Sequence, residues 1–116
     1  MLEPLTDLPA GVCGLRALGT VVAADVAAAI AGAAAAPGHA TTKGLVVLID
    51  ADFDGYLAEL VRGLATAAAA PAPAFARFAL IAPDGVVSEA RAHGADAPRI
   101  FPASQRADAL AFAAGR

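Results

Sequence analysis

The feature that most constrains the fold is an unbroken apolar run, Leu45–Ile49, that stops abruptly at acidic residues. It belongs to the sequence GLVVLIDADFDGY, Gly44–Tyr56, which carries Asp50, Asp52 and Asp54. A short β-branched and aliphatic run bounded by Gly and Asp is typical of a strand buried on both faces. In open α/β sheets, ligands bind beyond the carboxyl ends of such strands. We therefore expect any functional site to lie at this acidic end.

The rest of the chain predicts alternating strands and helices around that run. Further strands are predicted over Met1–Leu8, Gly11–Leu18, Phe75–Ala82 and Arg99–Phe101, the first two forming a hairpin. Helices are predicted over Ala23–Ala36, Gly55–Ala70, Gly85–His93 and Ser104–Ala114. Asp84 and Ser104 are predicted to cap the last two of these helices. Repeated β–α–β units imply parallel pairing and right-handed crossovers within an α/β domain.

Composition supports one domain, residues 1–116, with a core of small side chains. Hydrophobic residues make up 59% of the chain and charged residues 16%, while aromatic residues are only 5% and Trp is absent. Such a core depends on close approach of helices to the sheet rather than on bulky side chains. Because a chain so rich in hydrophobic residues leaves some apolar surface exposed as a monomer, we expect it to form a homodimer.

Charge and cysteine content exclude some classes of partner and location. The net charge is −3 and the eight basic residues are scattered in the sequence, which argues against nucleic acid as a partner. One cysteine, Cys13, cannot form an internal disulfide, so we expect a cytoplasmic protein in which it acts as a small buried hydrophobe. The longest apolar segment, Val21–Ala36, contains Asp25 and is too short to cross a bilayer, so membrane contact would be peripheral at most.

Four segments, in this order, resemble the SpoIIAA-like family, small proteins with a STAS-type fold that is also similar to CRAL-TRIO lipid-transfer domains. The segments are GVCGLRALGTVVAADV, LVVLIDADFDGY, FARFALIAPDG and RIFPASQRADALAFAAG. The resemblance implies a STAS-like α/β fold with a mixed sheet of four to five strands covered by about four helices. It also implies two roles: switching through protein–protein contacts, as in anti-sigma factor antagonists, or holding a lipid-like ligand at or near a membrane surface.

The switching proteins of this resemblance carry a phosphorylatable Ser or Thr in the loop after the central strand. Here that loop, residues 50–56, contains neither, and its aspartates already supply negative charge. A phosphorylation switch is therefore not expected at this place, although a permanently competent interaction surface remains an alternative.

The acidic cluster admits three interpretations. The sequence DADFDG matches the opening of an EF-hand calcium loop, but position twelve is Val61 instead of Glu, and a strand precedes the loop. A buried strand followed by Asp-x-Asp also resembles the first motif of haloacid dehalogenase-like phosphatases, with Asp50 as nucleophile, but the later Lys and acidic pair are not found. In the third interpretation, Asp52 and Asp54 cap the following helix and keep its loop solvated.

The sequence favours a non-enzymatic binding module with no metal and no cofactor. We expect it to hold a small apolar or lipid-like ligand, and the alternative is a protein-interaction module that uses the same surface. The predicted ligand or partner surface consists of Asp52, Phe53, Asp54, Tyr56, Leu57 and Leu60.

Overall fold

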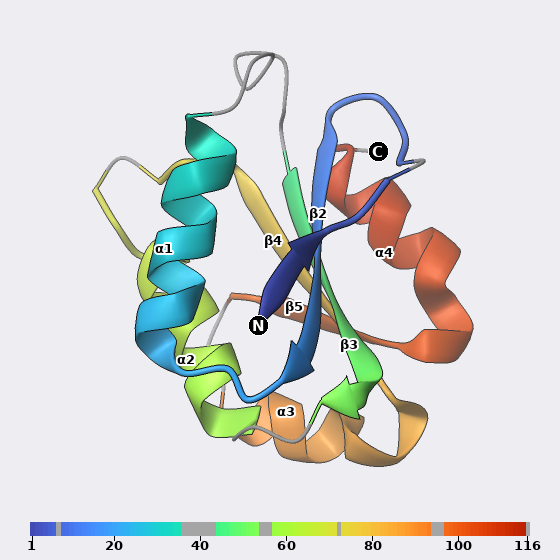
Figure 1. Cartoon of the computed structure of the whole chain (residues 1–116). Coiled ribbons are helices and arrows are strands. Elements are labelled where there is room, and N and C mark those ends of the chain that lie inside the picture. The colour runs from blue at the N-terminus through green and yellow to red at the C-terminus, as the bar shows by residue number, and fades with distance from the viewer. Residues whose placement is uncertain (7, 36–43, 54–56, 72, 94–96, 116) are drawn as a thin grey trace.

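The computed structural model describes residues 1–6, 8–35, 44–53, 57–71, 73–93 and 97–115. Within them the chain forms one mixed sheet whose strands lie side by side in sequence order (Figure 1). The strands are β1 Leu2–Pro4, β2 Val12–Gly19, β3 Gly44–Phe53, β4 Arg77–Ala82 and β5 Arg99–Pro102. β1 pairs antiparallel with β2, and all later pairs are parallel. The predicted hairpin and the predicted parallel pairing are both confirmed.

Helices cover both faces of this sheet. The described α-helices are α1 Ala23–Ala34, α2 Leu57–Ala68, α3 Val87–His93 and α4 Arg106–Ala113. α1 and α2 pack against each other on one face, and α4 lies across the opposite face against β3, β4 and β5 (Figure 1). α3 contacts β5 and the nearby α2. The fold is thus α/β, with a five-stranded mixed sheet and four α-helices in the described residues.

β3 is the central strand and divides the core into two layers. Leu45 and Val47 point toward α1 and α2 and are at most 1% exposed, and Val46 points toward α4 and is fully buried. The interpretation of this run as a strand buried on both faces is therefore confirmed. On the α4 side the core is thin, because small residues such as Ala109 and Ala113 of α4 meet the sheet directly.

Two glycines allow helices to approach this closely. A Cβ atom on Gly44 would overlap the carbonyl group of Ala113, so α4 rests directly on the start of β3. A Cβ atom on Gly63 would lie 2.9 Å from the Cβ of Val26, so α2 and α1 touch at this point. The Ala- and Gly-rich composition therefore permits close packing of α4 on the sheet and of α2 on α1.

The two predicted helix caps are wrong. Asp84 lies inside a 3₁₀ turn, η2 Asp84–Val86, and Ser104 lies inside another, η3 Ala103–Gln105. The amide nitrogen and Oγ of Ser104 lie 3.3 and 3.4 Å from Oδ1 of Asp84, to which both donate. Because β4 and β5 are parallel neighbours, the turns that follow them meet at one edge of the sheet, where Asp84 accepts hydrogen bonds from Ser104 of η3.

The lengths of the helices bear on whether one of them could cross a membrane. α1 and α2 are the longest helices in the described ranges, with 12 residues each. In that part of the chain no helix reaches the length and apolar character needed to cross a membrane.

Candidate functional site

A cavity of about 420 Å³ lies where β3 ends, between the first turn of α2 and the η2–α3 segment. We call it the carboxyl-edge cavity. Its walls are formed by Ile49, Asp50, Ala51, Phe53, Leu57, Pro83, Val86 and Glu89. In Figure 1 the arrowhead of β3 points toward α3, which crosses the end of the sheet there. This is the edge at which open α/β sheets bind ligands.

An irregularity in β3 shapes one wall of this cavity. Ala17 pairs with Ile49, but the next pair joins Gly19 to Phe53. One residue of β2 therefore spans the same distance as residues 50–52 of β3. Bulges of this kind bend a strand and redirect its side chains. The strand continues past Asp50 and Asp52 to Phe53, which still packs against the larger core.

The walls of the cavity are mainly apolar, with two carboxylates. Phe53 and Leu57 are partly buried and pack against the core on the α1–α2 side. Val86, from η2, packs against the same core. Asp50 and the exposed Glu89 supply negative charge at the rim. The site therefore combines an apolar interior with hydrogen-bond acceptors.

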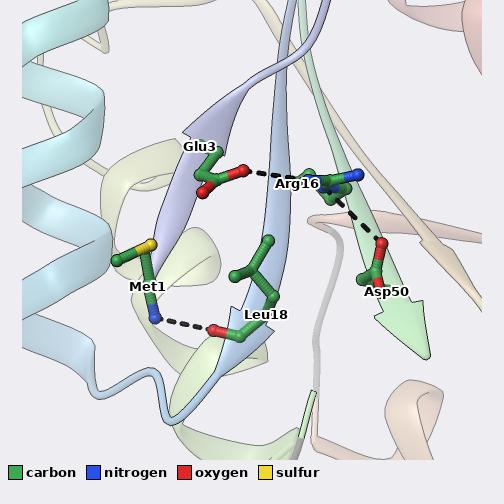
Figure 2. Close-up of polar contacts among 5 residues, drawn as sticks. All are labelled: Met1, Glu3, Arg16, Leu18 and Asp50. Carbon is green, nitrogen blue, oxygen red and sulfur yellow. Dashed lines mark hydrogen bonds and ion pairs between the residues drawn. The ribbon is translucent and has the colours of Figure 1, made fainter. Parts of the chain in front are cut away.

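Asp50 also belongs to a row of ion pairs across three strands (Figure 2). Nη2 of Arg16 lies 2.9 Å from Oε2 of Glu3, and Nε of Arg16 lies 3.5 Å from Oδ2 of Asp50. The row follows from the register, since Glu3 pairs with Arg16 and Arg16 pairs with Leu48, two residues before Asp50. These side chains are between 25% and 43% exposed, so each pair contributes no more than about 1 kcal/mol. Their main effect is to orient the Asp50 carboxylate and offset part of its charge.

The structure brings together only some of the predicted site residues. Phe53 and Leu57 line the carboxyl-edge cavity. Leu60 is fully buried in the core between α2 and the sheet, so it presents no surface to a ligand. Asp52 lies within β3, and Asp54 and Tyr56 fall outside the described residues.

Sequence reasoning missed the wall contributed by Pro83, Val86 and Glu89. These residues follow β4, which is the parallel neighbour of β3. The available signal was the topology: the segment after the next parallel strand must lie beside the segment after β3. The acidic run by itself contains no information on which strand lies beside β3.

The three interpretations of the acidic cluster all involve Asp54, which lies outside the described residues, so the structure bears only on their other residues. Val61, at position twelve of the calcium pattern, is fully buried in the core. In the ranges that the structure describes, no group of three or more His, Cys, Asp or Glu side chains could hold a metal ion. Asp52 is part of β3, and the acidic residue in the first turn of α2 is Glu59, whose Oε2 accepts a hydrogen bond from the amide of Ala23 at 3.2 Å. Glu59 thus joins α2 to the start of α1.

Another cavity, of about 340 Å³, lies between α1 and the β1–β2 hairpin. It is lined by Leu2, Pro4, Cys13, Gly14, Leu15, Ala29, Gly32 and Ala33, without a charged side chain. Burial raises the pKa of the Cys13 thiol, which keeps it protonated and weakly nucleophilic near neutral pH.

Comparisons with protein-family models, with curated proteins and with solved structures give no match to this chain.

Proposed function

We propose that this chain is a non-enzymatic module that binds a small apolar or lipid-like ligand in the carboxyl-edge cavity. The observation that carries the proposal is the position and lining of that cavity. Its volume of about 420 Å³ falls within the range of ordinary ligand pockets, about 300–1,000 Å³. Apolar walls with a few polar groups are typical of such pockets. The five-stranded α/β sheet is also what the SpoIIAA-like resemblance implied, and it supports this assignment.

The charges at the rim restrict the chemistry of the ligand. Asp50 and Glu89 both line the cavity, and only Asp50 has an ion-pair partner, Arg16, among the described residues. A fatty-acid carboxylate would be repelled by these groups. We therefore expect an apolar body whose polar end is neutral or positively charged, such as an alcohol, an amide or an amine.

The distribution of exposed apolar side chains favours a small ligand over a protein partner. Among the described residues, the exposed large hydrophobic side chains are Met1, at 60%, and Val22, at 40%. Met1 precedes β1 and Val22 precedes α1, so neither belongs to the cavity. Protein interfaces are centred on apolar and aromatic side chains that lose their exposure on binding. The carboxyl edge instead concentrates its apolar surface inside a concave site.

The test is binding of the neutral apolar dye Nile red to the wild type, to Leu57→Asp and to Val22→Asp. Both substitutions add one carboxylate at the start of a helix, where negative charge is tolerated. We expect saturable fluorescence enhancement with the wild type and with Val22→Asp, and an affinity lower by about tenfold or more with Leu57→Asp. Circular dichroism confirms that both variants are folded. Equal affinity of all three proteins would contradict the proposal.

A further inference from the structure

A separate cavity, of about 360 Å³, lies at the opposite end of the parallel strands, where β4 and β5 begin. We call it the amino-edge cavity. Its walls are formed by Ala68, Phe75, Ala76, Arg77, Phe78, Ala97, Arg99 and Phe112. It shares no lining residue with the carboxyl-edge cavity. It is therefore a separate cavity, and what is proposed for it does not rest on the function proposed above.

Two arginines in this cavity share one aromatic ring. The Cζ atoms of Arg77 and Arg99 each lie 5.0 Å from the centre of the Phe112 ring, and Arg99 also lies 5.4 Å from the centre of the Phe101 ring. The sheet register explains this arrangement. Arg99 pairs with Ala79, two residues after Arg77, so both arginine side chains are on the face that α4 covers.

The two guanidinium groups lack the carboxylate partners that arginines in proteins often have. Arg16 is paired with Glu3 and Asp50, but neither Arg77 nor Arg99 has a carboxylate partner among the described residues. Both lie 5.0 Å from one ring centre, so their separation is at most twice that distance. This is comparable to the Debye length of about 8 Å at physiological ionic strength, so the two positive charges repel each other.

A structural role accounts for only one of these arginines. Nη1 of Arg77 donates a hydrogen bond to the carbonyl oxygen of Phe112 at 3.3 Å, near the end of α4, where a positive charge is favourable. Arg99 makes no such hydrogen bond in the described part of the chain, and its contacts are with the faces of Phe101 and Phe112. A guanidinium held against aromatic faces is preorganised, so it loses little rotamer entropy when its N–H groups bind an oxyanion.

We propose that the amino-edge cavity binds the oxyanion group of a small molecule, a phosphate or a carboxylate, between Arg77 and Arg99. An anion there offsets the repulsion between the two cations and occupies their free N–H donors. Phe112 and the neighbouring Phe75 and Phe78 give the cavity an apolar side against which the body of the ligand packs.

The test is a titration of the folded protein, followed by ¹H–¹⁵N NMR, with sodium phosphate and separately with sodium acetate at constant ionic strength. The proteins compared are the wild type, Arg99→Gln, Arg77→Lys and the control Arg62→Gln, whose arginine is exposed on α2. We expect saturable shifts of the amide signals of Ala97, Arg99 and residues 110–113 with at least one of the two anions. Loss of a charge-assisted contact should weaken that binding by about tenfold or more in Arg99→Gln, with no change in Arg62→Gln.

Arg77→Lys keeps a positive charge near the C-terminal end of α4, where it is stabilising, but loses the bidentate hydrogen-bonding geometry of the guanidinium group. We expect it to remain folded and to bind the anion more weakly than the wild type. Saturation with phosphate alone would identify a phosphate site, and saturation with acetate alone a carboxylate site. Two results would overturn the proposal: no saturable shifts with either anion, or equal affinity in the wild type and Arg99→Gln.

Discussion

The two ends of the parallel strands β3, β4 and β5 border cavities of similar size and opposite charge. At the carboxyl edge, Asp50 and Glu89 stand at the rim of an apolar cavity of about 420 Å³. At the amino edge, Arg77 and Arg99 line a cavity of about 360 Å³ with aromatic walls. Between them, the described residues include no buried polar or charged side chain. The difference shows that a sheet buried on both faces concentrates its polar chemistry at the strand ends, where register decides which charges meet.

The two edges also hold their charged groups in different ways. Asp50 is oriented by Arg16, which lies one strand away and is itself bound to Glu3 (Figure 2). Arg77 and Arg99 are oriented by the ring of Phe112 on α4. The amino edge therefore depends on the seating of α4, and the carboxyl edge does not. Four predictions use this difference, in order of decreasing effect.

The largest effect is expected where α4 rests on β3. In Gly44→Ala the new methyl group overlaps the Ala113 carbonyl, so α4 must shift, and we expect the free energy of unfolding to fall by about 3 kcal/mol. Urea unfolding followed by circular dichroism measures it. Gly85→Ala is the matched control, because a Cβ there meets no atom within 4 Å, and its change should stay within about 0.5 kcal/mol. Equal stability of the two variants would show that α4 does not seat on Gly44.

A smaller loss is expected from removing the ring at the amino edge. Phe112→Leu keeps an apolar side chain but loses the ring contact with Phe101, 5.8 Å between centres, and both arginine contacts. We expect a loss of about 1–2 kcal/mol in the same unfolding measurement. Phe112→Tyr retains the ring and should stay within about 0.5 kcal/mol of the wild type. If both variants lose the same stability, the ring does not stabilise the two arginines.

The ion pairs at the carboxyl edge should contribute less. Asp50→Asn removes the pair with Arg16, whose side chains are 25% and 43% exposed, so we expect the free energy of unfolding to fall by about 1 kcal/mol or less. Glu3→Gln, which removes the other pair of the row, is expected to behave alike. Urea unfolding at low and high salt provides the measurement. A loss above about 2 kcal/mol for Asp50→Asn would mean that the main role of this carboxylate is to stabilise the fold and not to line the cavity.

The smallest effect concerns the uncharged cavity under α1, which serves as a reference for the two charged ones. Burial raises the pKa of Cys13 in the folded protein above its unfolded value, so the folded state holds this proton more tightly. The contribution of this thiol to the free energy of unfolding is therefore complete below its ordinary pKa of about 8.5, and it is lost as the pH rises above that value.

Urea midpoints of the wild type and Cys13→Ala, compared from about pH 7.5 to 10, isolate this contribution. We expect the wild type to lose more stability than the variant as the pH rises. Parallel curves, or a wild type that gains relative to Cys13→Ala, would show that the thiol is not desolvated.

The fold could be predicted from the sequence because the strongest signals in the sequence are local and periodic. The run Leu45–Ile49 could be interpreted directly as a strand buried on both faces, and the β–α–β repeat then required parallel neighbours. The same reasoning predicted a site at the end of this strand, where the structure has a cavity whose lining includes Phe53 and Leu57. The apolar spacing of α2 does not by itself separate core from ligand surface, and the packing of α2 against α1 and the sheet places Leu60 in the core.

The remaining features depend on which strands become neighbours. Asp84 and Ser104 each have the sequence signature of a helix cap, yet they bind each other because β4 and β5 end side by side. Arg77 and Arg99 are separated in sequence and look like scattered charges, but parallel register places both beside Phe112. Neither pairing has a local sequence signal, since each is a consequence of sheet order.

Native mass spectrometry of the purified protein from dilute ammonium acetate tests the central proposal most directly, because it reports bound small molecules and oligomeric state together. We predict an adduct of a few hundred daltons on the wild type that dissociates on activation, and its loss in Leu57→Asp but not in Val22→Asp. The same spectrum shows whether the expected homodimer forms. A wild-type protein that remains free of adducts, both as purified and after incubation with neutral or cationic amphiphiles, would contradict ligand binding at the carboxyl edge.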